Sequence, residues 1–84
     1  MITFKSSKKH PEIKGIFYKD AYVGNMSQYE DKFYVVSVLD CIFKNPLDPT
    51  EEEIEKAKRA VKIYKSKQAA LIHLILTYRV LKPA

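Results

Sequence analysis

The sequence predicts a mainly α-helical domain, with one helix over residues 28–44 and a long, kinked helix over 49–81. Three observations carry this prediction. A capping-box pattern occupies residues 27–30, a helix-start pattern occupies 48–53, and no proline or glycine interrupts the stretch that follows until Pro83. With 84 residues, the chain has room for one domain, which we take to span its whole length.

An extended or short β segment is expected before the helices. Residues 2–5 fit a short strand, and 16–23 fit a second short strand or an extended arm. Between them, Pro11 and Gly15 break the pattern and favour a loop.

The helix over 28–44 is predicted from its start and its stop. Ser27 is placed as the N-cap and Glu30 at the third helical position, and the run ends before Asn45-Pro46. A buried strand over 33–43 stays open as an alternative, because the run contains the β-branched residues Val35, Val36, Val38 and Ile42.

The helix over 49–81 is predicted from Asp48 as a cap, Pro49 at the first helical position and the acidic first turn that follows. Apolar residues then repeat at spacings of three and four, as in a helical seam. A straight helix of this length would measure about 50 Å, whereas a compact domain of this size is roughly 30 Å across. We therefore expect a kink near Lys65–Gln68 or a helix that protrudes into a partner.

The segment 69–81 is apolar on nearly all sides of a helix. A helix of this kind must be buried all round, so the sequence predicts a homo-oligomer. The alternation of Ile72, Leu74, Leu76, Tyr78 and Val80 also fits a strand over 71–81. Together with a strand over 33–43, this would give an α+β fold.

Catalytic and metal-binding patterns are weak. Cys41 is the single cysteine and lies in an apolar run, which favours an inert thiol, and His10 and His73 are far apart in sequence. The two glycines form no phosphate-binding loop. We therefore expect no enzyme activity, no catalytic residues, no metal and no cofactor.

Charge is distributed unevenly along the chain, which carries a formal net charge of +5. Residues 1–19 have five lysines and one acid, 20–55 have nine acids and two lysines, and 56–84 have eight basic residues and no acid. Solvated helix faces would explain this pattern, and so would a basic pocket for an anion.

The best binding signal is a mixture of lysines and aromatic residues. Lys14 and Lys19 can neutralise phosphates, while Tyr18 or Tyr22 can stack on a base.

Near the C-terminus, Thr77 offers a hydroxyl and Arg79 a bidentate phosphate contact. Arg79 lies in an apolar run, so inside the protein it would need an anionic partner such as Asp40 or a ligand.

Two short motifs resemble a known family. His10-Pro11-Glu12-Ile13-Lys14-Gly15, followed by Tyr18, and the ending Arg79-Val80-Leu81-Lys82-Pro83 are similar to segments of small phage anti-CBASS proteins. The resemblance implies a helical, oligomeric sponge that binds cyclic oligonucleotides without cutting them.

These observations lead to one leading hypothesis and one alternative. The leading hypothesis is a non-enzymatic homo-oligomer that sequesters a phosphate-bearing nucleotide, such as a cyclic oligonucleotide immune signal. The alternative is a small inhibitor or adaptor that binds a partner protein, for example a host protein, through its apolar helical seam. No apolar run is long enough for a membrane span and the first ten residues lack a signal-peptide core, so we expect the cytoplasm, or the host cytoplasm for a phage protein.

Overall fold

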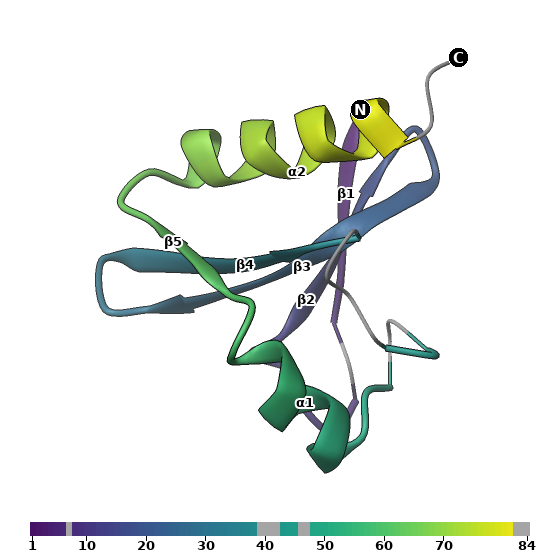
Figure 1. Cartoon of the computed structure of the whole chain (residues 1–84), viewed down its shortest axis with the longest axis vertical. Helices are drawn as coiled ribbons and strands as arrows, with labels where there is room; N and C mark the ends of the chain where they lie inside the picture. The colour runs from purple at the N-terminus through teal and green to yellow at the C-terminus, as the bar shows by residue number, and fades with distance from the viewer. Residues whose placement is uncertain (7, 39–42, 46–47, 82–84) are drawn as a thin grey trace.

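The chain forms a five-stranded antiparallel sheet with two helices (Figure 1), as described by a computed structural model for residues 1–6, 8–38, 43–45 and 48–81. The strands lie in the sheet in the same order as in the chain. In chain order the elements are β1 (Ile2–Ser6), β2 (Lys14–Tyr18), β3 (Ala21–Tyr29), β4 (Lys32–Ser37), α1 (Glu51–Ala57), β5 (Lys62–Tyr64) and α2 (Lys67–Leu81).

The prediction of a mainly helical protein is wrong, because the fold is α+β with the sheet dominant. The helix expected over 28–44 is replaced by the end of β3 and by β4. Ser27, the expected N-cap, pairs with Tyr34 across these two strands, and Glu30 lies in the tight turn between them with a φ of 58°. The β-branched residues of β4 therefore decide the local structure, because they fit a pleated surface buried on both faces.

The long helix expected over 49–81 is also wrong, because the chain leaves helical structure after Ala57 and forms β5 before α2 begins. The break between α1 and α2 includes Lys65, where the expected kink region begins, but it starts earlier, directly after Ala57. The alternative strand over 71–81 is wrong as well, since these residues belong to α2. Tertiary packing explains the break, because β5 pairs with β4 and adds a fifth strand to the sheet.

The hydrophobic core lies between α2 and one face of the sheet. Its buried side chains come from β2, β3, β4 and α2, and they are Ile16, Val23, Met26, Val35, Ala70 and Leu74. Leu74 packs directly over Gly24, where β3 has no side chain. This close approach brings α2 down onto the sheet.

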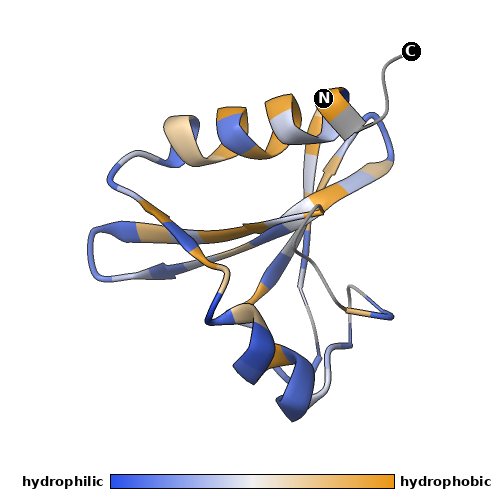
Figure 2. Cartoon of the chain, in the orientation of Figure 1, coloured by the Kyte–Doolittle hydropathy of each residue, from blue (hydrophilic) through white to orange (hydrophobic). Residues whose placement is uncertain are grey.

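The outer face of α2 is apolar and exposed. Ile72 is 48% exposed, Leu76 54% and Val80 79%, although Ala70 and Leu74 on the inner face are fully buried. Figure 2 shows that α2 is largely hydrophobic, whereas α1 is mostly hydrophilic. Within one chain, the segment expected to be buried on all sides is thus buried on one side only.

The two helices lie on opposite sides of the sheet (Figure 1). As a result, α2 covers one face, while α1 approaches the other face near β3 and β4 and leaves part of it open. In the part of the chain that the structure describes, no helix has the length and apolar character needed to cross a membrane.

The N-cap of α1 lies two residues later than the expected cap at Asp48. Thr50 is the N-cap, and its hydroxyl oxygen accepts from the Glu53 N–H at 3.2 Å. In return, the Glu53 carboxylate accepts from the Thr50 N–H at 2.9 Å, which completes a capping box. Removing the hydroxyl with Thr50→Ala should cost about 1 kcal/mol of stability.

Candidate functional site

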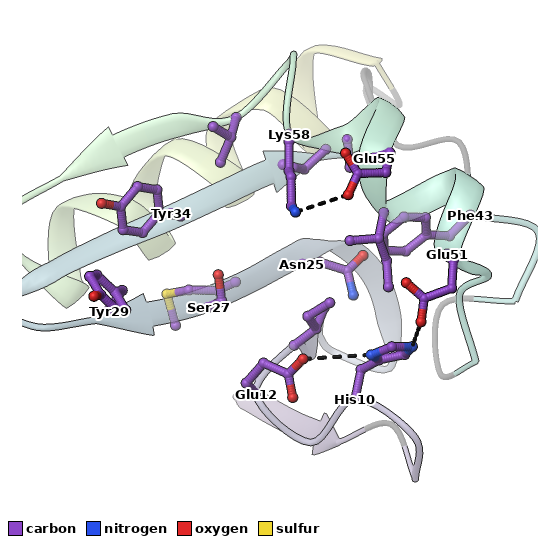
Figure 3. Close-up of a pocket in the computed structure, with 16 residues that line it drawn as sticks. His10, Glu12, Asn25, Ser27, Tyr29, Tyr34, Phe43, Glu51, Glu55 and Lys58 are labelled. Carbon is purple, nitrogen blue, oxygen red and sulfur yellow. Dashed lines mark hydrogen bonds and ion pairs between the residues drawn. The ribbon is translucent and has the colours of Figure 1, made fainter.

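A cavity of about 600 Å³ lies on the open face of the sheet, beside α1 (Figure 3). Its walls come from β3, β4, α1 and the segment between β1 and β2 that carries His10. Small-molecule and cofactor sites commonly have volumes of roughly 300–1,000 Å³. Among the described residues, this cavity is larger than a second hollow near Lys14, and its size suits a binding site.

Strand alternation creates the sheet side of the cavity. On β3, Asn25, Ser27 and Tyr29 line it, and on β4, Tyr34 and Val36 do so. On β4 these positions alternate with the core residue Val35, because successive side chains of a strand point to opposite faces. The remaining apolar walls are supplied by Ile13, Phe43, Ile54, Ala57 and Val61.

Asn25 is a buried polar group in the floor of the cavity, with 3% of its surface exposed. Its side-chain oxygen accepts from the Tyr22 hydroxyl, and its amide nitrogen donates to the Lys14 carbonyl oxygen at 3.4 Å. Because these bonds hold the amide, Asn25 shapes the floor. A ligand would therefore gain most of its contact from the apolar walls.

The rim of the cavity is acidic. His10 lies between two carboxylates, with Nδ1 at 3.6 Å from Glu12 and Nε2 at 3.6 Å from Glu51 (Figure 3). Glu55 pairs with Lys58 at 3.1 Å. The lining thus carries three carboxylates and one lysine, which favours a ligand with positive charge.

Glu53 links α1 to the segment that carries Phe43. Besides its capping bond, its carboxylate accepts from the Lys44 N–H at 3.0 Å. The bonds from the backbone N–H groups of Thr50 and then Lys44 lower the pKa of the Glu53 carboxyl below its ordinary value. This anchoring ties the backbone next to Phe43, which lines the cavity, to α1.

Glu53→Gln should make the acid dependence of stability weaker. A carboxyl whose pKa is depressed by folding stabilises the protein above its unfolded value of about 4.5, and this contribution is lost as the pH falls through the folded value. Urea unfolding of both proteins at neutral pH and below pH 4 measures the effect. We expect the variant to be less stable at neutral pH and the difference to shrink in acid. A constant difference at all pH values would contradict this assignment.

The residues predicted from sequence as a ligand site are spread over the molecule. Lys14 lies at one end of β2, whereas Tyr18 packs against the core at the other end. Lys19 lies in the following turn, with its ammonium nitrogen 5.4 Å from the centre of the Tyr18 ring. Tyr22 is on β3, where its hydroxyl donates to the Asn25 side chain and its ring lies 5.6 Å from that of Phe17.

Thr77 and Arg79 lie on α2. The Thr77 hydroxyl donates to the His73 carbonyl oxygen at 2.8 Å, and Arg79 is exposed in the last turn of the helix. Asp40, the expected partner of Arg79, and Cys41 both lie outside the described residues. One chain therefore brings Tyr18 and Lys19 together, but does not gather all six residues in one pocket.

A smaller hollow of about 260 Å³ lies near Lys14, on the side of the sheet that α2 covers. Lys67 also lines it, and its ammonium nitrogen lies 4.5 Å from the centre of the Phe4 ring. Phe33 and Gln28 contribute to the walls, together with Glu12. Lys14 is thus the one predicted ligand residue that lines either hollow.

The sequence analysis does not predict the cavity beside α1, because the helix expected over 28–44 covers the end of β3 and all of β4. The signal was present in the alternation of Ser27 and Tyr29 and of Tyr34 and Val36. Among the residues that the structure describes, no group of three His, Cys, Asp or Glu side chains is placed to hold a metal ion. Comparisons with protein-family models, curated proteins and solved structures found no match.

Proposed function

We propose that this chain is a non-enzymatic binding protein whose cavity captures a basic, amphipathic segment of a partner protein. The observation that carries the proposal is the acidic rim around largely apolar walls in a cavity of about 600 Å³. This function belongs to the inhibitor or adaptor class, and we place it in the cytoplasm.

The walls support capture of apolar side chains. Ile54 and Ala57 of α1 and Tyr34 and Val36 of β4 all line the cavity, so side chains that enter it contact apolar atoms from both the helix and the sheet. An amphipathic helix that inserts one apolar ridge into a groove binds in this way. Burial of this ridge would supply most of the affinity.

The rim supports selection of a basic segment. Glu12, Glu51 and Glu55 keep 63%, 85% and 69% of their side chains exposed, so their carboxylates remain within reach of lysines or arginines on a partner. Exposed ion pairs add little affinity each, but they orient a partner and exclude acidic ones. Asn25, the buried polar group in the floor, is held by hydrogen bonds to Tyr22 and to the Lys14 carbonyl oxygen, which favours a structural role for it.

The proposal is tested with a synthetic amphipathic peptide that has leucine at every fourth position and lysines on its flanks. We expect saturable binding with a Kd below about 100 μM, and no binding of a matched peptide with glutamates in place of the lysines. Ser27→Trp should abolish binding by filling the cavity, whereas Thr3→Trp, at an exposed position of β1 away from it, should not.

The contribution of the rim is tested by neutralising two carboxylates. The double variant Glu12→Gln, Glu55→Gln should weaken binding of the lysine peptide by about 2- to 30-fold, the loss expected for two exposed ion pairs. Calorimetry measures the affinity, and circular dichroism checks that each variant is folded. Equal binding of both peptides, or unchanged binding to Ser27→Trp, would contradict the proposed function.

A nucleotide ligand is the second candidate, favoured by the hollow near Lys14. Two lysines, Lys14 and Lys67, and two aromatic rings, Phe4 and Phe33, line this hollow, and these are groups that neutralise phosphates and stack on bases. Calorimetry against cyclic di- and trinucleotides tests the candidate. Binding below about 100 μM that is weakened by Lys14→Ala would support it. No binding in that range would exclude a sponge for these ligands.

A further inference from the structure

We propose that the basic, amphipathic segment captured by the cavity is α2 of a second copy of this chain, which gives a head-to-tail assembly. This inference rests on the proposed function, because it names the partner of the same cavity. The assembly would bring together two surfaces that are exposed in a single chain: the apolar outer face of α2 and the acid-rimmed cavity.

The outer face of α2 has the required shape. Ile72, Leu76 and Val80 follow one another at intervals of four residues, so they form a single ridge on the exposed side. Eight residues of helix measure about 12 Å, and three side chains along that length make a short ridge. The inner face is packed on the core, so the ridge is free to enter a groove on another molecule.

The distribution of charge favours docking of α2 into the cavity of another copy over direct packing of two α2 helices against each other. Residues 62–81 contain no acid, and Lys62, Lys65, Lys67 and Arg79 are exposed on β5, α2 and the link between them. A two-fold pair of α2 helices would place these basic groups near one another. Docking α2 into the cavity places them near Glu12, Glu51 and Glu55 instead.

The placement of the two surfaces sets the type of assembly. Because α2 and the cavity lie on opposite sides of the sheet, a chain cannot fill its own cavity, and each copy presents one of each surface (Figures 1 and 3). Contacts between different surfaces are head-to-tail, and they continue until a ring closes or a filament forms. The assembly would also bury apolar surface that a domain of 84 residues cannot bury alone.

Two variants that each block one surface test this arrangement. Leu76→Asp puts a charge on the ridge, at a position exposed enough to keep the fold, and Ser27→Trp fills the cavity. In analytical ultracentrifugation, wild type should form species larger than a dimer at about 100 μM, and each variant alone should sediment as a monomer of 9.8 kDa. An equimolar mixture should give a one-to-one heterodimer that does not grow further, because each chain keeps one working surface.

Thr3→Asp and Thr3→Trp are the matched controls, since Thr3 is exposed and lines neither hollow. Both should assemble like wild type. A Ser27→Trp protein that still dimerises, with a mixture that forms no heterodimer, would overturn the inference in favour of two-fold α2 pairing. A monomeric wild type would overturn it too. In that case, binding of the lysine peptide would leave the proposed function standing, and absence of binding would remove both.

Discussion

Gly24→Ala should destabilise the protein by roughly 3 kcal/mol or more, a large share of the roughly 4–13 kcal/mol expected for an 84-residue domain. Gly24 has a φ of 153°, which residues with a side chain rarely adopt. A Cβ atom at this position would lie 2.5 Å from the Val36 carbonyl oxygen and 2.7 Å from Cδ2 of Leu74. Urea unfolding followed by circular dichroism measures the loss.

A double variant separates the two clashes. Gly24→Ala combined with Leu74→Ala removes the contact with Cδ2, but it leaves the contact with the backbone carbonyl of Val36, which cannot rotate away. The two losses should therefore not add, and the double variant should be more stable than their sum predicts. A Gly24→Ala protein within about 0.5 kcal/mol of wild type would contradict the close packing of α2 on β3.

Leu74→Ala should cost about 2–5 kcal/mol, the range measured for leucines removed from protein cores. Leu74 is fully buried between α2 and the sheet. Leu76, two residues further along the same helix, is 54% exposed, and Leu76→Ala should change the stability of the monomer by no more than about 0.5 kcal/mol.

This pair of leucines is its own control, because the two substitutions are chemically identical. Thermal and urea unfolding are measured at a low protein concentration, where any assembly has dissociated. Equal losses at both positions would show that α2 does not pack on the sheet through the face that carries Leu74.

Local sequence signals predicted a helix where the chain forms the end of β3 and β4. Ser27 and Glu30 have the spacing of a helical capping box, but the same residues can end a strand and form a turn. The β-branched run of β4 pointed to a strand, and pairing with β3 on one side and β5 on the other stabilises it. Strand pairing depends on residues distant in the sequence, so a local pattern could not decide between the two.

The helix starts and the charge pattern were more informative. The acidic turn after Pro49 does begin a helix, although the cap is Thr50. The sequence also showed an acidic middle and a basic C-terminal part, but it could not show that Glu51 and Glu55 lie on one side of the sheet and α2, with Lys67 and Arg79, on the other (Figure 1). The cavity joins His10, β3, β4 and α1, which are separated by many residues, and its existence follows from the tertiary fold.

The central claim is that the acid-rimmed cavity binds a basic, amphipathic segment, and an NMR titration tests it most directly. Labelled Leu76→Asp protein, which we expect to be monomeric, is titrated with the synthetic amphipathic peptide that has leucine at every fourth position and lysines on its flanks. We predict saturable shifts of amides that line the cavity, including Ser27, Val36 and Ile54, and no such shifts in the Ser27→Trp, Leu76→Asp double variant. Shifts confined to α2 or to the hollow near Lys14, or no shifts at all, would contradict the claim.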